Sequence, residues 1–334
     1  MTVTLAQAKL NATDDVDVQI IDEFQKSNDI LNRITFDDVV SGAGNGATLT
    51  YSYTRQLTQR GAAFRAINSE YTPTQATKVR ASVDLVPLGG SFQIDRVLNR
   101  VAQAAETAFQ MRELLKGSSA KFSDSFFNGD TAVDANGFDG LNKILTGTTT
   151  EYLPLANGTT AGYRDWTGVD TKAEAIAEIE EIDNWLSLLD GPPDAIYGPK
   201  KVLSKFKRLA MWADQYEKTT DAFGRPINTY NGIPLIDPLT KDGSNTDILA
   251  LATRDTDAGG AGGNITNLGD LYAVRFALDG VHGVAMSDGP LVRNWLPDFS
   301  TAGAVKTGEA EMGPVAVVMK KTKSAGVFRN IKVA

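Results

Sequence analysis

Residues 48–92 decide how this chain is interpreted: they open with TLTYSYTRQL (48–57) and close with KVRASVDLVPLGGSF (78–92). Both stretches alternate in character and are rich in Thr, Tyr or Val, as β-strands are. In the second stretch Lys78, Arg80, Ser82 and Asp84 share one face, and apolar residues occupy the other. We predict a long β-hairpin with a loose, arginine-bearing tip over residues 58–77. A two-stranded ribbon is marginally stable in water and has unpaired edges, so this hairpin is expected to need a partner surface.

The chain before the hairpin is acidic and contains one predicted helix. Residues 1–12 are small and polar and are expected to form an arm. A helix is predicted over residues 14–33, because Thr13 can cap it and Val16, Ile20, Phe24 and Leu31 recur at helical spacing. This amphipathic helix can pack on its own domain or on a neighbouring molecule, and the sequence leaves both possibilities open. The glycine-rich segment SGAGNGAT (41–48) is predicted to be a loop.

The chain after the hairpin is predicted to begin with a single long helix over residues 95–127, about 50 Å in length. The sequence NGD (128–130) ends this helix, and a Gly/Thr-rich loop follows at residues 146–160. A second helix starts at the capping box formed by Thr171 and Glu174 and ends at residue 191. A third helix is predicted over residues 199–216, with its lysines and Arg208 on a solvated face.

Short strands alternate with these helices without a regular βαβ repeat. The predicted strands are DAIYG (194–198), NGIPLIDP (231–238), TDILALAT (246–253), LYAVRFALDGVHGVAM (271–286) and the tail PVAVVMKKTKSAGVFRNIKV (314–333), which is interpreted as paired strands. This irregular mixture favours an α+β fold over a doubly wound sheet.

Composition excludes several classes of site. The 334 residues include no cysteine and one histidine, His282, which excludes disulfides, thiolate nucleophiles, Cys-based metal centres and multi-histidine metal sites. The net charge of −8 argues against nucleic-acid binding by the protein as a whole. The N-terminus does not resemble a signal peptide, and no apolar run is long enough for a membrane span. We therefore expect a protein that is made and used in a cytoplasm, without cofactor or metal.

Catalytic motifs are also missing from the sequence. GAGNG (42–46) precedes a predicted strand, whereas a dinucleotide-binding loop follows a strand and opens a helix. Neither a phosphate-binding P-loop nor a GxSxG nucleophile elbow occurs. Asp37 and Asp38 are adjacent in an extended stretch and point apart, and His282 is interpreted as a packed structural residue. We predict no catalytic residue, so the chain is not expected to be an enzyme.

Charge is divided between the arm and the hairpin. Residues 11–40 carry eight acidic and two basic side chains, whereas residues 51–96 carry six basic and three acidic ones. We expect these two segments to meet across subunits, where charge steers assembly and fixes register; ordinary surface charge is the alternative. The predicted inter-subunit contact residues are Asp14, Asp15, Asp22, Glu23, Arg55, Arg60, Arg65, Lys78 and Arg80.

Four phrases, in order along nearly the whole chain, carry a resemblance to a known family. They are FFNGDTAVDANGFDGL (126–141), YNGIPLIDP (230–238), LYAVRFALDGVHG (271–283) and FRNI (328–331). With the arm, hairpin and long helix before them, the chain resembles the major capsid proteins of tailed bacteriophages, which have the Hong-Kong-97-type fold. The resemblance implies an N-arm (1–45), an E-loop lying over the neighbouring subunit (46–94), a P domain with a spine helix (95–160), a segment that is mostly A domain (161–302) and C-terminal strands returning to the P domain (303–334).

The same resemblance implies a function. Hexamers and pentamers would close into an icosahedral shell around double-stranded DNA, giving a virion assembled in the host bacterial cytoplasm. Scaffolding is expected from a separate protein or from a segment already removed, with a portal and a decoration protein as further partners. No motif allows the Lys–Asn cross-link of one branch of the family to be transferred. An encapsulin-like compartment shell and, in a different class, a soluble α/β hydrolase or binding protein are the alternatives.

Overall fold

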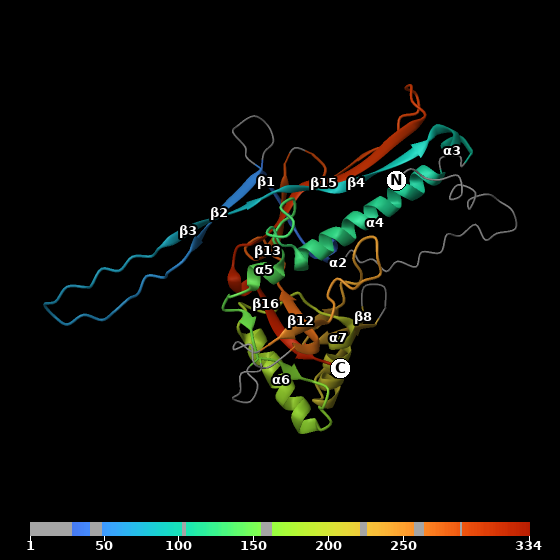
Figure 1. Cartoon of the computed structure of the whole chain (residues 1–334). Coiled ribbons are helices and arrows are strands. Elements are labelled where there is room, and N and C mark those ends of the chain that lie inside the picture. Colours follow the sequence, from blue (N-terminus) through green and yellow to red (C-terminus); the bar gives the residue numbers. More distant parts are fainter. Residues whose placement is uncertain are drawn as a thin grey trace.

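Two lobes make up the body of the chain, and a β-hairpin projects from the upper one (Figure 1). The computed structural model describes residues 29–40, 49–101, 105–154, 162–220, 226–256, 264–287 and 289–334. The predicted helix over 14–33 therefore lies largely outside the described residues, and only its end is seen, as α2 (Asp29–Arg33). Among the residues that the structure describes, no helix has both the length and the apolar character needed to span a bilayer.

The upper lobe is a five-stranded sheet with a long helix on one face. Its strands are β1 (Phe36–Val40), β4 (Val86–Asp95), β13 (Val281–Met286), β14 (Val292–Trp295) and β15 (Val305–Met319). The order is β1-β13-β15-β14, with β4 paired along β15. Helix α4 (Ala105–Asn128) packs against β4 and β15, and α3 (Arg96–Val101) precedes it. At 1.5 Å per residue, α4 spans about 36 Å.

Strands β4 and β15 show that α4 covers only one face of this sheet. Phe92 and Ile94 of β4 and Gly308 and Ala310 of β15 are buried, and the residues between them are exposed or only partly buried. Gly308 permits the close packing under the helix, because a Cβ there would lie 2.5 Å from the ring of Phe92. The small residues of β15 thus leave room for the Phe92 ring beneath α4.

The lower lobe is built on a nine-stranded sheet that is buried on both faces. The strands are β5 (Glu151–Tyr152), β6 (Arg164–Asp165), β7 (Ala195–Tyr197), β8 (Tyr216–Thr220), β9 (Pro226–Tyr230), β10 (Ile233–Ile236), β11 (Ala252–Asp255), β12 (Asn264–Val274) and β16 (Ala325–Lys332). The order is β5-β16-β12-β7-β10-β9-β8, with β11 on β12 and β6 on β16. Along β7 and β12, alternate residues enter two different hydrophobic clusters.

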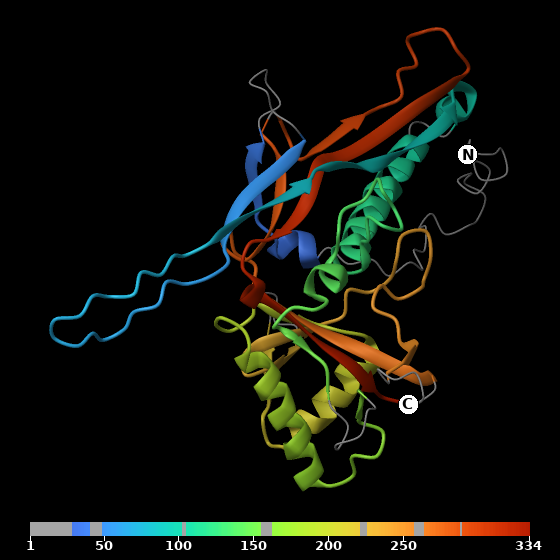
Figure 2. The same cartoon turned by 60° about the vertical axis from the view of Figure 1, so that its left-hand side comes forward.

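Helices cover the lower sheet on the side away from the upper lobe (Figure 2). They are α6 (Lys172–Ser187) and α7 (Lys200–Trp212), while the short α5 (Leu141–Leu145) lies at the junction of the lobes. The capping box predicted for α6 is confirmed, since the Thr171 side chain accepts a hydrogen bond from the Glu174 backbone and Glu174 caps in return. A single 3-10 turn, η1 (Thr322–Ser324), leads from the upper sheet into the lower one.

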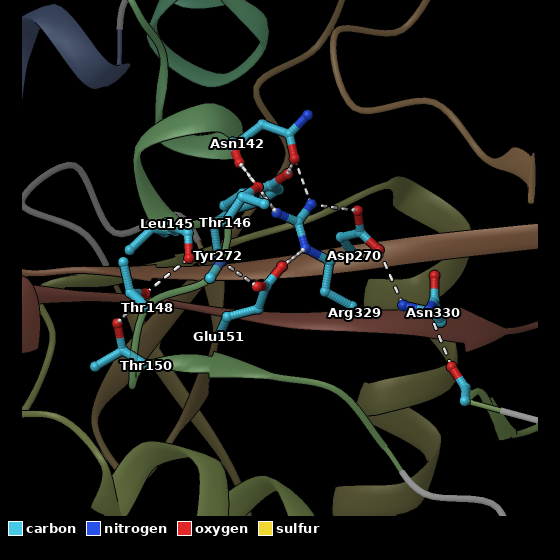
Figure 3. A network of polar contacts seen from close by, with 12 residues as sticks. Asn142, Leu145, Thr146, Thr148, Thr150, Glu151, Asp270, Tyr272, Arg329 and Asn330 are labelled. Atoms are coloured by element: carbon cyan, nitrogen blue, oxygen red, sulfur yellow. Dashed lines mark hydrogen bonds and ion pairs between the residues drawn. The ribbon is translucent and has the colours of Figure 1, made fainter. Parts of the chain in front are cut away.

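A buried polar network ties the two lobes together at this junction (Figure 3). The pairing of β12 with β16 shifts register next to Arg329, whose side chain reaches Asn142 of α5. Its guanidinium donates to Glu151 Oε1 at 2.7 Å, to the backbone carbonyl of Asn142 at 3.0 Å and to Thr146 Oγ1 at 3.0 Å. It also lies 3.5 Å from Asp270 Oδ2. Leu141 and Leu145 of α5 pack in a hydrophobic cluster to which both sheets contribute, so this arginine adds polar contacts to the apolar packing between the lobes.

The hairpin prediction is confirmed, with β2 (Thr50–Gln56) antiparallel to β3 (Lys78–Asp84). The register runs from Thr50 opposite Asp84 to Gln56 opposite Lys78. It places the predicted polar residues of β3 on one face of the ribbon. The loop beyond, residues 57–77, contains no helix or strand.

Other sequence predictions are wrong about where elements end and what they pair with. The predicted strand over 78–92 is two strands, because the chain passes from β2 to β15 at the buried Leu85. The predicted single helix over 95–127 is replaced by α3 and α4, and Asp95 belongs to β4, where its carboxylate accepts from the Val97 backbone at 2.7 Å. The tail strands do not pair with each other, since β15 lies in the upper sheet and β16 in the lower one.

Candidate interaction surface

The hairpin tip exposes large apolar side chains to solvent. Phe64 and Ile67 expose 108% and 91% of their reference areas, and Leu57 and Tyr71 are also exposed. Figures 1 and 2 both show this loop extending away from the two lobes. Several large apolar side chains exposed on one projecting loop are typical of an interaction site in a folded protein. The tip is therefore the first part of the candidate surface.

Basic side chains stand among these apolar residues. Arg60, Lys78 and Arg80 are exposed, and none of them forms an ion pair or side-chain hydrogen bond with another described residue. Arg65 lies over the Tyr71 ring at 5.4 Å and donates to the Ser69 carbonyl at 3.2 Å. The hairpin thus presents positive charge whose counter-ion does not come from the described part of its own chain.

The base of the hairpin is anchored to the upper lobe. Arg55 donates to the carbonyl of Met319 at 2.8 Å and to that of Lys320 at 3.1 Å, and the Tyr53 hydroxyl donates to Met319 at 3.1 Å. Tyr51 is buried and meets His282 edge-on, with ring centroids 6.3 Å apart. The base is therefore held in place while the tip projects.

The predicted contact residues fall into three groups. Asp14, Asp15, Asp22 and Glu23 lie outside the described residues. Arg55 lies at the hairpin base and is engaged within its own chain. The remaining four all lie on the hairpin, Arg60 and Arg65 in its loop and Lys78 and Arg80 in β3.

Sequence reasoning missed the apolar half of this surface. It identified the basic residues of the hairpin but not Phe64 and Ile67. Phe64 lies between Arg60 and Arg65, and Ile67 follows Arg65, in a stretch with neither helical nor strand periodicity. Large apolar residues without periodicity have no place in a regular element of their own subunit. That combination is the signal that could have found them.

A cavity of about 450 Å³ lies at the hairpin base, lined in part by Tyr53, Asp84, Asp139 and Thr131. Both of its carboxylates have structural partners: Asp84 accepts from Thr50 at 2.6 Å and Asp139 from Lys143 at 2.9 Å. Burial raises the pKa of Asp139, but hydrogen bonds from Thr131 and Lys143 outweigh it and hold the pKa below its usual value. The lining contains no histidine, and the described residues contain no cluster of three or more metal-ligating side chains.

Comparison with solved structures identifies the fold, whereas comparison with family models and curated proteins finds no match. No family model matches the chain, and no curated protein matches it by sequence. Solved structures do match over its full length. The encapsulin of the holo-SrpI complex from Synechococcus elongatus PCC 7942 aligns with a TM-score of 0.55 at 13% identity, covering 100% of this chain and 98% of that one.

Two capsid structures also match over nearly the whole chain. The capsid of a native GTA particle aligns with a TM-score of 0.56 at 13% identity, covering 99% of this chain and 98% of the other. The capsid of Myoviridae phage XM1 aligns with a TM-score of 0.51 at 12% identity, covering 98% of each chain. At such low identity these likenesses establish the fold alone. The chain is an α+β protein of the Hong-Kong-97 type, the fold expected from the sequence.

Proposed function

We propose that this chain is a major capsid protein that self-assembles into hexamers and pentamers and closes an icosahedral shell around phage double-stranded DNA. The observation that carries the proposal is the projecting hairpin, whose tip exposes Phe64, Ile67 and basic side chains. Burying this surface requires a second molecule, and identical copies supply one in a symmetric assembly. The full-length likeness to capsid and encapsulin chains supports the same conclusion.

The parts of the fold take their roles from this proposal. Residues 1–45 act as the N-arm, 46–94 as the E-loop, 95–160 as the P domain with α4 as its spine helix, 161–302 mostly as the A domain, and 303–334 as strands returning to the P domain. Within the E-loop range, residues 86–94 already belong to β4 of the upper sheet. The role is structural, without enzymatic activity.

The proposed partners are many copies of the same chain, held in part by charge. The acidic residues of the arm are proposed to contact the basic residues of a neighbour's hairpin, among them Lys78 and Arg80. These acidic residues are Asp14, Asp15, Asp22 and Glu23. A separate scaffolding protein, a portal and a decoration protein complete the list. The chain resides in the virion and passes through the host bacterial cytoplasm during assembly. The DNA is enclosed without sequence-specific binding, since an acidic protein repels it.

Microscopy and sedimentation of the purified full-length chain test this proposal. We expect closed shells or capsomers in negative stain and fast-sedimenting species in the ultracentrifuge. A chain that stays monomeric at low salt over a wide range of concentration would contradict the proposal and favour the soluble hydrolase or binding protein. Particle contents separate the two shell functions, because nuclease-protected DNA indicates a virus and a co-purified enzyme indicates an encapsulin-like compartment.

A further inference from the structure

Helix α7 is strongly basic, although the chain as a whole carries a net charge of −8. Its sequence contains no acidic residue and five basic ones, which are Lys200, Lys201, Lys205, Lys207 and Arg208. The apolar side of the helix, with Val202 and Phe206, is buried in the lower lobe, whereas none of the five basic residues is buried. The basic residues therefore lie on the side of α7 that faces away from the sheet.

Among the described residues, acids balance only part of this positive charge. Lys200 Nζ lies 3.5 Å from Asp237 Oδ2, and Arg208 Nη2 lies 3.7 Å from Asp170 Oδ1. Both distances are longer than the roughly 2.7–2.9 Å of a charge-assisted hydrogen bond, and the two basic side chains remain 50% and 49% exposed, so these ion pairs are weak. Lys201 is exposed and forms no ion pair or side-chain hydrogen bond with another described residue.

The first turn of α7 also favours an anionic partner. No side chain caps the helix at Pro199, and its first turn contains no acidic residue. Instead, Lys200 and Lys201 lie next to the positive end of the helix dipole, which is an unfavourable place for cations. A negatively charged group bound near these two lysines would relieve this repulsion.

The composition of the outward side favours phosphate groups over a protein partner. The exposed residues between positions 200 and 208 are Lys200, Lys201, Ser204 and Arg208, so no large apolar side chain is exposed there. Interfaces between proteins usually depend on buried aromatic and apolar anchors. Lysine, arginine and serine side chains, by contrast, are typical ligands of the phosphates of nucleic acids.

The spacing of the basic residues suits a repeating polyanion. Lys201, Lys205 and Arg208 follow one another at steps of four and three residues and therefore share one side of the helix. At 1.5 Å per residue they extend over about 10 Å. Double-stranded DNA carries one negative charge per roughly 1.7 Å of its axis, so a duplex lying along α7 offers several phosphates within this length.

The neighbouring helix α6 is acidic, but several of its carboxylates are engaged within the lobe. Glu178 and Glu181 lie 2.8 Å and 3.7 Å from the guanidinium of Arg164. Glu174 takes part in the capping box with Thr171. Because Arg164 offsets part of the negative charge of α6, the repulsion that DNA meets beside α7 is reduced.

We propose that the outward side of α7 binds the phosphate backbone of double-stranded DNA without reading its sequence. This inference rests on the proposed function, in which the shell encloses DNA, and it adds the surface that the DNA contacts. The contact is weak and sensitive to salt, because the rest of the acidic chain repels DNA. In a filled shell, α7 faces the interior.

DNA binding by the full-length chain, below the concentration at which it assembles, tests the proposal. Fluorescence anisotropy of two labelled duplexes of unrelated sequence gives the affinity at several salt concentrations. The logarithm of the affinity should fall with the logarithm of the salt concentration, with a slope of about 0.9 per phosphate contacted. Lys201→Gln with Lys205→Gln and Arg208→Gln should weaken binding of both duplexes by the same factor and reduce this slope by about 2–3. Far-UV circular dichroism checks that the variant is folded.

A matched control removes the same charge from the other basic segment of the chain. Arg60→Gln with Arg65→Gln and Arg80→Gln changes exposed residues of the hairpin and should bind DNA like the wild type. If this control loses as much affinity as the α7 variant, or if the α7 variant binds both duplexes as tightly as the wild type, α7 is not the surface that contacts DNA.

Lysine acetylation of assembled particles gives a second readout. Lys201 should be acetylated more slowly in DNA-filled particles than in emptied ones, as measured by mass spectrometry. Equal rates would place α7 away from the DNA and overturn this inference, while the shell function would stand. A wild-type chain that forms no particles would instead overturn the proposed function.

Discussion

The single histidine is a structural residue of β13 that packs against the base of the hairpin. His282 is fully buried, its Nδ1 lies 3.4 Å from the Gly280 carbonyl, and its Nε2 has no hydrogen-bond partner among the described residues. Burial lowers its pKa below the ordinary 6.5, and the positive charge of Lys320 adds to this effect. A neutral imidazole packed against Tyr51 agrees with the sequence interpretation of this residue.

Acid should therefore destabilise the subunit through His282. Because the folded state disfavours the protonated ring, the unfolded state binds more protons, and the free energy of unfolding falls as the pH drops below about 6.5. Each unit by which folding lowers the pKa of His282 reduces the free energy of unfolding by about 1.4 kcal/mol, once the pH is below the pKa values of both the folded and the unfolded state. Urea unfolding of the unassembled subunit at several pH values should show this loss. A His282→Gln variant keeps the carboxylates of the wild type but lacks the imidazole. If the free energy of unfolding falls equally steeply with decreasing pH in both proteins, His282 is not the cause of the loss.

Arg329 makes a stronger contribution, because it is a buried charge with several partners. The side chains of Arg329 and Glu151 are each 10% exposed. Removing one member of a buried pair leaves the other unpaired, so Arg329→Met should lower the free energy of unfolding by about 3–5 kcal/mol. Denaturant titration of the unassembled subunit measures this loss.

A second variant shows whether the pair itself is responsible. Arg329→Met leaves the Glu151 carboxylate buried without its partner, and Glu151→Gln removes that charge. The double variant should therefore lose clearly less free energy of unfolding than the sum of the losses in the two single variants. Asp270 retains Arg254 at 2.7 Å in both variants, which keeps the rest of the network paired. Strictly additive losses would mean that the two residues act independently.

At the scale of elements, short sequence motifs correctly predicted the features that form between residues close together in the chain. The capping box at Thr171 and Glu174 fixed the start of α6, because both residues act within one turn. The alternation over 48–57 and 78–84 gave the ribbon β2–β3 and its polar face. The α+β class followed from the irregular order of such elements.

Pairing between distant segments could not be read in the same way. β15 and β16 both have the apolar, β-branched composition of buried strands, and only three-dimensional packing places them in different sheets. The periodicity over 95–127 likewise did not reveal that Asp95 belongs to a strand and that Val97 is exposed. An apolar stripe indicates that a helix is buried somewhere, but not against what.

At the scale of the whole molecule, charge is unevenly distributed, with acidic residues concentrated in segment 11–40 and basic residues in segment 51–96. The net charge of −8 makes copies repel one another at long range, whereas the proposed pairing of the acidic arm with the basic hairpin of a neighbour would attract at contact. Individual exposed ion pairs contribute about 0–1 kcal/mol each. Many such contacts, repeated in a closed shell, can nevertheless hold it together.

Salt should therefore weaken assembly of the wild type. Screening shortens the Debye length from about 10 Å at 0.1 M to about 3 Å at 1 M, which removes much of the attraction between exposed charges. We expect the critical concentration of the wild type to rise with ionic strength in light-scattering or sedimentation assays. If salt instead strengthens wild-type assembly, apolar burial or relief of the net charge dominates, and charge pairing is not what brings the copies together.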